Sequence, residues 1–384
     1  MDSSMKRTWA EVDLQAIAAN YKALRAVLEP GCRMLGVIKA NAYGHGDLEV
    51  ASLLQALGSE YLAVATLDEA IHLRENGIRI PILILGFTPP SRTEELLRYD
   101  VTQCAADFGA ATAMSDAAVR LGGRVRIHLK LDTGMGRLGF PVHHGEDPTP
   151  ELAELMRLPG LDTEGIFTHF AVSEYADSAY TQKQFADFVA ISGKLETITG
   201  QKFRIRHCAN SGAMLNYKEM HLDMVRAGIA LYGLYPGGDT PQCGVRLRPA
   251  MSLRTRIVQV RDAKADWSVS YGRTYTTDKP RRIAVLPIGY ADGLHRVLSG
   301  KLDVLVHGRR APQIGRICMD MCMIDVTEIP DAAAGDVATI FGNDGPSFIS
   351  VDEVAEKADT ISYEMLCALS PRIPRIHLRG DRTV

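Results

Sequence analysis

The sequence has no long apolar segment, no excess of one charge and no dense set of cysteines. It contains 384 residues, and its 43 lysines and arginines nearly balance 46 aspartates and glutamates, for a formal net charge of −3. No stretch approaches the ~20 apolar residues of a membrane-spanning helix. We therefore expect neither a nucleic acid nor a membrane as partner.

The seven cysteines are few and scattered. Cys318 and Cys322 lie close together, but no matching histidine pair follows them, so we expect no metal site. Such scattered cysteines are typical of reduced thiols. The N-terminal residues have no apolar core of a signal peptide. We therefore expect a cytoplasmic protein.

Eight short apolar runs alternate with helical patterns in the first 240 residues. The runs cover residues 34–39, 61–65, 81–85, 101–104, 125–131, 165–169, 203–208 and 224–226. Alternation of this kind predicts parallel strands with crossover helices, and eight such units favour a (β/α)₈ TIM-type barrel. A doubly wound open sheet is the alternative, but it requires a glycine-rich turn after its first strand, and residues 41–46 (NAYGHG) do not form one.

The pattern changes near residue 240, after the linker-like segment 236–241. Strand-like segments then predominate, at 251–260, 282–288, 302–307, 323–326 and 337–341, and a helix is predicted at 351–369. We predict an α/β protein with a barrel over residues 13–240, whose first helix is capped by Asp13, and a mainly-β domain over 241–384. Residues 1–12 are predicted to add a strand to the second domain.

Polar residues follow the predicted barrel strands at the end where barrels carry their active sites. Lys39, Lys130, His169 and Arg226 end strands one, five, six and eight, and His207, Asn210 and Ser211 follow strand seven. A lysine at the end of a buried run is desolvated, which favours its neutral, nucleophilic form; a lysine that simply extends to solvent is the alternative.

Ser211 and Gly228 lie in the loops after strands seven and eight, where barrels often bind phosphate. A nucleophilic lysine beside a phosphate site indicates pyridoxal phosphate, with Arg226 as partner of the pyridine nitrogen. In the second domain, the turn-like segment 270–275 presents Tyr271 as a candidate acid/base; a strand-edge aromatic is the alternative.

Several segments together resemble the alanine racemase family. They are 37–46 (VIKANAYGHG), 130–137 (KLDTGMGR), 226–229 (RAGI), 270–275 (SYGRTY), 289–293 (GYADG) and 362–364 (SYE), in family order and along nearly the whole chain. The resemblance implies a pyridoxal-phosphate-dependent isomerase that interconverts L- and D-alanine and supplies D-alanine for peptidoglycan. It also implies a homodimer whose active sites are shared between subunits.

The resemblance also assigns roles to residues. It implies that Lys39 holds the cofactor and acts as one base, and that Tyr271 is the second base. The implied cofactor-binding residues are Tyr43, Ser211, Gly228, Ile229 and Tyr363 for the phosphate, Arg226 for the pyridine nitrogen, and His169 near the ring. Arg137 and the backbone amide of Met319 are implied to bind the substrate carboxylate, and Lys130 occupies a position at which many relatives carry a carbamylated lysine.

Two other functions stay open at this point. Met321 stands where the family often has glutamine, so a racemase of broader specificity, acting also on serine, is one alternative. A non-catalytic protein that binds pyridoxal phosphate is another. Such proteins have the barrel but lack the second domain and the second base, which makes this alternative the weaker one.

Overall fold

The computed structural model describes residues 6–142, 145–379 and 382–383. The chain forms two compact units. One, the barrel unit, comprises Ile17–Ala42 and Asp47–Arg248. The other, the β unit, comprises the described residues before Ile17, the short segment Tyr43–Gly46, and the described residues from Pro249. The division into two compact units does not test whether residues 13–240 and 241–384 fold independently, so these domain boundaries stay a prediction.

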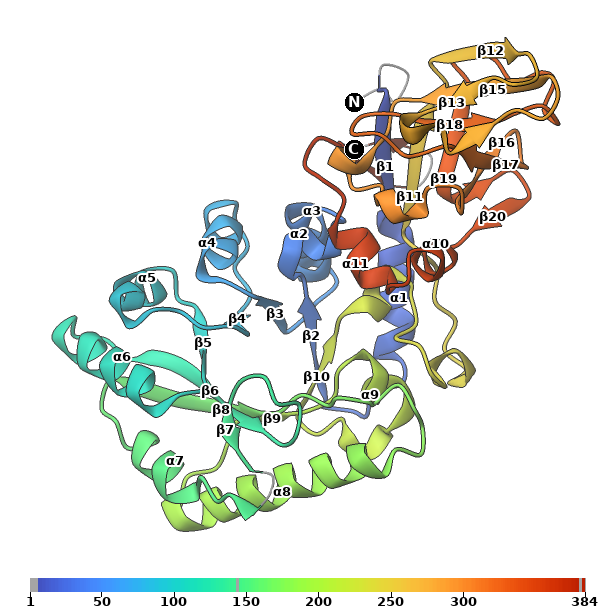
Figure 1. Ribbon diagram of the computed structural model, residues 1–384. Helices are drawn as coiled ribbons and strands as arrows, with labels where there is room; N and C mark the ends of the chain where they lie inside the picture. Colours follow the sequence, from blue (N-terminus) through green and yellow to red (C-terminus); the bar gives the residue numbers. More distant parts are fainter. Residues whose placement is uncertain (1–5, 143–144, 380–381, 384) are drawn as a thin grey trace. The chain divides into compact units, whose positions relative to one another are not determined.

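Among its described residues, the barrel unit contains eight parallel strands in the order β10-β2-β3-β4-β5-β6-β8-β9, with β7 added beside β6 (Figure 1). Their bounds are β2 Arg33–Val37, β3 Tyr61–Val64, β4 Ile82–Ile84, β5 Thr102–Ala105, β6 Val125–Asp132, β7 Phe140–Pro141, β8 Leu161–Phe167, β9 Ile205–His207 and β10 Met224–Ala227. The first and last strands of this order, β10 and β9, are joined by two backbone bonds that N–H groups of Asp223 and Arg226 donate to Arg206 and Ala209, at 3.2 and 2.9 Å. These bonds draw the sheet into a barrel.

Helices alternate with these strands, and several of them begin at side-chain caps. Their bounds are α1 Leu14–Arg25, α2 Lys39–Tyr43, α3 Asp47–Ala56, α4 Leu67–Glu75, α5 Thr93–Arg98, α6 Phe108–Arg120, α7 Thr149–Leu155, α8 Ala179–Thr199 and α9 Ser211–Asn216. Asp13 caps α1, because its Oδ1 accepts the N–H groups of Gln15 and Ala16. Asp107 and Ser178 cap α6 and α8 in the same way.

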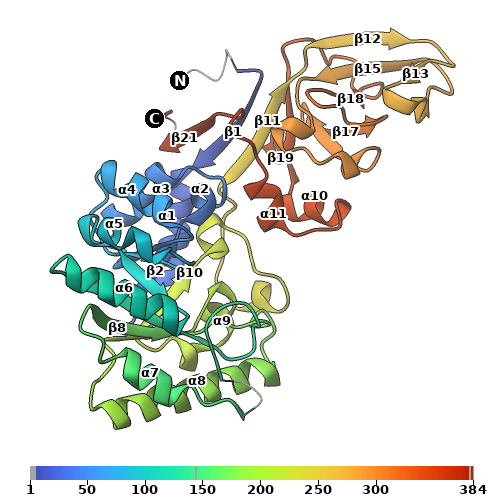
Figure 2. The same ribbon diagram turned by 60° about the vertical axis from the view of Figure 1, so that its left-hand side comes forward.

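The β unit is built on one long sheet in the order β12-β15-β18-β17-β16-β19-β11-β1-β21-β22, with β20 beside β19 and a separate pair β13-β14 (Figure 2). The bounds are β1 Thr8–Asp13, β11 Met251–Arg256, β12 Gln259–Ala263, β13 Ser268–Val269, β14 Tyr275–Thr276, β15 Arg281–Leu286, β16 Asp303–Val306, β17 Arg309–Ile314, β18 Cys322–Asp325, β19 Val337–Asp344, β20 Ser347–Ile349, β21 Arg375–Arg379 and β22 Arg382–Thr383, with helices α10 Val351–Lys357 and α11 Ser362–Cys367. The N-terminal strand β1 lies between β11, antiparallel, and β21, parallel.

A barrel followed by a mainly-β unit confirms the predicted fold class. Several predicted bounds are wrong. Lys39 and His169 lie two residues beyond their strands, Lys130 lies inside β6, and Arg226 is the last residue but one of β10. The predicted strand 251–260 is two strands, and the predicted helix 351–369 is interrupted where Asp359 takes a φ of +56°. No helix in the described part of the chain is long and apolar enough to cross a membrane.

Candidate active site

The segment after β2 is a turn of left-handed backbone that begins at Lys39. The φ angles of Ala40, Asn41, Ala42 and Tyr43 are +54°, +55°, +53° and +52°. Each such L-residue costs roughly 1–2 kcal/mol, so other contacts must hold the turn. It starts at the C-terminal end of a barrel strand, which is where this fold places its chemistry.

Glu69 supplies one of these contacts. Its carboxylate accepts three backbone N–H groups: those of Ala40 and Ala65 at 2.7 Å and that of Thr66 at 3.1 Å. The bond to Thr66 belongs to the capping box that begins α4. One side chain therefore fixes the residue after Lys39 and the end of β3 together.

His169, just beyond β8, lies within electrostatic reach of four cationic residues of the barrel unit. Burial lowers its pKa well below the usual value, and the charges of Arg226, Lys130, Arg137 and Lys39 lower it further. The ring is neutral, and its Nδ1 lies 3.2 Å from Nη2 of Arg226. The structure thus brings five of the predicted site residues together at this end of the barrel.

Arg226 is buried and held by backbone carbonyls. Its Nη2 donates to the carbonyls of Thr168 and Cys208 at 2.8 and 3.0 Å, and its Nη1 donates to the carbonyl of His207 at 3.2 Å. Burial lowers its pKa to about 10. The guanidinium therefore stays charged at neutral pH and occupies a fixed position.

Lys130 is buried beside this cation. Its Nζ donates to the carbonyl of Leu131 at 3.0 Å and lies 5.1 Å from the centre of the Phe167 ring. Burial lowers its pKa to about 7, and Arg226 contributes to the same shift. A large fraction of this amine is uncharged near neutral pH.

Arg137 lies in the loop after β6, and its side chain is exposed. Asp132 shapes this loop, because its Oδ1 accepts the N–H groups of Gly134 and Gly136, both at 3.0 Å. The charge of Arg137 is near enough to lower the pKa values of Lys130 and His169, although burial is the larger cause for both. The loop therefore presents a donor fork beside the buried cations.

Ser211 and Gly228 meet as predicted, at the ends of two neighbouring strands. The hydroxyl of Ser211 accepts the N–H groups of Gly228 at 2.9 Å and Ala230 at 3.4 Å, and Ile229 lies between these residues. Backbone N–H groups, a hydroxyl and buried cations are the donors that an anionic cofactor with a phosphate requires. The residues of the barrel unit therefore fit pyridoxal phosphate.

In the β unit, Tyr43 and Tyr363 are close, with ring centres 6.0 Å apart. Burial raises the pKa of Tyr43. The next residue, Gly44, has a φ of +80°, and its carbonyl accepts Nε of Arg375 at 2.8 Å. The ring contact and the bond at Gly44 hold Tyr43 beside the C-terminal part of the chain. It therefore lies near Tyr363, which is also predicted to bind the phosphate.

Tyr271 projects from a tight turn of the β unit. Ser270 and Gly272 have φ angles of +65° and +72°, and the Ser270 hydroxyl donates to the carbonyl of Arg316 at 2.6 Å. The Tyr271 side chain is 69% exposed. The turn therefore holds the phenol away from the sheet.

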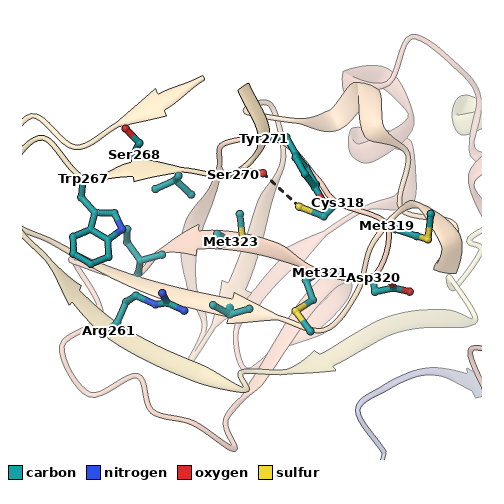
Figure 3. A pocket seen from close by; sticks show the side chains of 13 residues that line it. Arg261, Trp267, Ser268, Ser270, Tyr271, Cys318, Met319, Asp320, Met321 and Met323 are labelled. Atoms are coloured by element: carbon teal, nitrogen blue, oxygen red, sulfur yellow. Dashed lines mark hydrogen bonds between the residues drawn. The ribbon is translucent and has the colours of Figure 1, made fainter. Parts of the chain in front are cut away.

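Tyr271 and Met319 line one open pocket of about 470 Å³, whose other lining residues include Trp267, Met321 and Met323 (Figure 3). The Met319 carbonyl accepts the N–H of Ala291 at 3.0 Å. A Cβ on Gly289 would lie 2.4 Å from this carbonyl oxygen, so glycine is required there. The pocket combines the predicted second base with a predicted substrate-binding amide.

Three residues of the barrel unit were missed. Glu69 holds the turn after Lys39, and His128 and Glu164 are linked to His207 and so to Arg226. Glu164 precedes a predicted strand and Glu69 lies in the first turn of α4, where acidic residues are common on the surface. Two histidines in apolar runs, at 128 and 207, are the sequence signal that could have indicated a buried polar chain.

Comparison with known proteins decides the family. The model of the alanine racemase N-terminal domain matches residues 12–236, and that of the alanine racemase C-terminal domain matches residues 250–377. This chain belongs to the alanine racemase family. The predicted family is therefore confirmed, as are the predicted cofactor, pyridoxal phosphate, and the activity: the protein is an isomerase that interconverts L- and D-alanine.

Individual alanine racemases match over nearly the whole chain. That of Desulfosudis oleivorans is 46% identical over 379 residues, covering 97% of both chains, and that of Methanococcus maripaludis is 43% identical, covering 96% of this chain and 98% of the relative. The structure of alanine racemase from Clostridium difficile 630 has a TM-score of 0.93 at 38% identity and covers 99% of this chain and 98% of its own. The alternative of a single-barrel binding protein is wrong, because the match includes the second domain.

In the described residues, no cluster of three histidines, cysteines, aspartates or glutamates has the geometry to hold a metal ion. Cys322 is buried, which raises the pKa of its thiol to about 12. The roles of individual site residues stay predictions, since the comparisons concern whole domains.

Proposed function

We propose that this alanine racemase moves the Cα proton between two bases, Lys39 on one face of the substrate and Tyr271 on the other. When bound, pyridoxal phosphate withdraws electrons from Cα and so acidifies its proton. The observation that supports this is the convergence of Lys39, Lys130, Arg137 and Arg226 on the neutral ring of His169. Two bases on opposite faces allow the proton to leave one face and arrive at the other.

The other residues bind and orient. Arg137 and the Met319 N–H would hold the substrate carboxylate, while Ser211, Gly228, Ile229, Tyr43 and Tyr363 would hold the cofactor phosphate. His169 would lie near the cofactor ring. Arg226 would be the partner of the pyridine nitrogen, and because a guanidinium can only donate, it would leave this nitrogen unprotonated.

We propose that Lys130 is carbamylated. Its uncharged amine attacks carbon dioxide, forms an N–C bond and releases one proton, which leaves a negatively charged carbamate. The lowered pKa of Lys130 supplies the uncharged amine. A carbamate there would face the positive charges of Arg226 and Arg137 and would orient the Arg137 guanidinium.

We also propose that the protein is a homodimer in which each site takes Lys39 from one subunit and Tyr271 from the other. A base for Cα has to work where water is excluded, yet Tyr271 is 69% exposed. Its neighbours Trp267, Met319 and Met321 are 45%, 53% and 48% exposed, an apolar patch of the kind that a second copy covers.

The cellular role that we propose is supply of D-alanine for peptidoglycan in the cytoplasm. All seven cysteines lie in the described residues, and none of them forms a disulfide there, as a reducing compartment favours. We do not restrict the substrate to alanine, because Met321 lines the pocket beside Met319, and serine is the first competitor to test.

The deciding experiment is incubation of the purified protein with L-alanine and, separately, L-serine, followed by chiral analysis of the product. We expect D-alanine to form at an equilibrium ratio near one. Borohydride should attach the cofactor covalently to the wild type at Lys39 and leave Lys39→Ala unmodified. No D-alanine from a protein that is loaded with cofactor would contradict the proposal.

A further inference from the structure

A continuous row of polar side chains crosses the inside of the barrel, starting at Arg226. Arg226 Nη1 lies 3.2 Å from Nδ1 of His207, His207 Nε2 lies 2.8 Å from Nδ1 of His128, and His128 Nε2 lies 3.1 Å from the Glu164 carboxylate. The Tyr61 hydroxyl also donates to Glu164. The row connects β10, β9, β6, β8 and β3.

The groups at the two ends of this row decide which group donates each hydrogen bond along it. A guanidinium only donates, so His207 must accept at Nδ1 and carry its hydrogen on Nε2. His128 then accepts at Nδ1 and donates from Nε2 to the carboxylate. Burial lowers the pKa of both histidines, which keeps both rings neutral and leaves one tautomer for each.

The strands are modified locally to make room for this row. The pairing of β6 with β8 shifts between Ile127 and His128, which leaves Glu164 as an extra residue in a bulge. A Cβ on Gly165 would lie 2.9 Å from the His128 ring, so a side chain there would displace the ring.

The two rings nearest the site are also fully packed. Phe167 stacks on His207 with ring centres 4.7 Å apart and planes at 6°, and His128 and His207 are both 0% exposed. Apolar side chains usually fill a barrel interior. A polar row that is satisfied at every step there acts as a rigid support.

We propose that Glu164, His128 and His207 are positioning residues that fix the guanidinium of Arg226. Glu164 sets the tautomer of His128, which sets that of His207 and so presents a lone pair to Arg226. If His207 carried its hydrogen on Nδ1, two N–H groups would face each other and the guanidinium would shift from the cofactor. This inference rests on the proposed role of Arg226 toward the pyridine nitrogen.

The first test is ¹⁵N NMR of the holoenzyme labelled at its histidines, with signals assigned through His128→Gln and His207→Gln. We expect both residues to be neutral with the hydrogen on Nε2 at pH 7. A charged ring, or a hydrogen on Nδ1 of His207, overturns the proposal even if the enzyme racemises alanine normally. This measurement on the wild type needs no variant to be active.

The second test compares two replacements of Glu164. Glu164→Gln keeps an acceptor for His128, so we expect its tautomers, cofactor absorption spectrum and kcat to stay within about threefold of the wild type. Glu164→Leu removes the acceptor; we expect a shifted cofactor spectrum and a kcat lower by roughly 10- to 100-fold, as when outer partners of functional groups are lost elsewhere.

Glu196→Leu is the matched control. Glu196 also lies in the barrel unit, has a side chain 12% exposed against 15% for Glu164, and accepts from Lys202 and from the Phe203 N–H. We expect this variant to lower Tm without changing the spectrum or kcat. If Glu164→Leu also lowers Tm without changing the spectrum or kcat, the row only stabilises the fold. Failure of the wild type to racemise alanine would instead contradict the proposed function.

Discussion

Lys130 shows how burial, with a smaller contribution from a neighbouring cation, changes the charge of a side chain at this site. It is 5% exposed, and its pKa falls to about 7 from a value near 10.5 in the unfolded chain. Between these two values the unfolded chain binds more protons than the folded one, so the free energy of unfolding rises with pH. A pKa difference of one between the folded and unfolded chain corresponds to about 1.4 kcal/mol, and the full penalty is present below pH 7.

We therefore predict that Lys130→Met, which removes the amine, is more stable than the wild type at pH 6 and loses this advantage as pH approaches 10. Thermal unfolding in buffers free of carbon dioxide measures the difference. Lys202→Met is the control, because the Lys202 side chain is 84% exposed. A constant difference between pH 6 and 10 would mean that Lys130 does not titrate in this range.

Glu69 gives a second prediction for a single side chain. Glu69→Ala leaves the N–H groups of Ala40, Ala65 and Thr66 without their acceptor. We expect a stability loss of about 1–3 kcal/mol and a kcat lower by roughly 10- to 100-fold, since Lys39 is misplaced.

The neighbouring Asp68 is the control for Glu69, because it lies on the same helix, is 77% exposed and pairs with Arg92. Asp68→Ala should leave kcat unchanged. Equal effects of the two replacements would show that helix α4 as a whole, rather than the contact with Ala40, is what matters.

The residues of the site were predictable to different extents. Lys130, His169 and Arg226 stand out because each interrupts or follows an apolar run at one end of the barrel. Glu69 gives no such signal, since its contact with Ala40 joins residues 29 positions apart and depends on how two loops fold.

At the scale of elements, hydrophobic periodicity found the barrel strands but not the irregular segments. All eight predicted runs overlap a strand, because buried parallel strands are continuously apolar. The left-handed turn that begins at Lys39 could not be predicted, since its residues Ala40, Asn41 and Ala42 contain no glycine. Likewise, β17 (RRAPQI) was missed, because its burial does not follow from its composition.

Replacing Gly44, the residue that follows this turn, tests how the turn is held. A Cβ there would lie 2.3 Å from the carbonyl oxygen of Leu366, in addition to the strain of a φ of +80°. We expect Gly44→Ala to displace Tyr43 and to weaken cofactor binding by about tenfold or more.

Gly58→Ala is its control, because Gly58 has a φ of +83° with nothing within 4 Å of an added Cβ. Equilibrium titration of the apoprotein with pyridoxal phosphate measures both variants. If both variants lose cofactor affinity to the same extent, backbone strain, and not the contact with Leu366, explains the loss.

At the scale of the whole molecule, the proposed dimer can be tested by mixing two inactive variants. Lys39→Ala and Tyr271→Phe homodimers should each be nearly inactive. In a hybrid dimer with shared sites, one site lacks both bases and the other has both. Random mixing makes about half of the dimers hybrid, so roughly a quarter of wild-type activity should return. No recovery, with hybrids shown to be present by mass spectrometry, would place both bases in one subunit.

The position of β1 in its sheet sets the timing of folding during synthesis. β1 ends at Asp13, but its neighbours β11 and β21 begin at Met251 and Arg375. At about 5–20 residues per second, the ribosome needs roughly 20–70 s to deliver the second neighbour after the first strand. The edge of β1 that pairs with β11 is open until that strand is made, and the edge that pairs with β21 stays open throughout, although the strands of the barrel are complete at Ala227. Until β21 is made, this edge of β1 is open to aggregation and to chaperones.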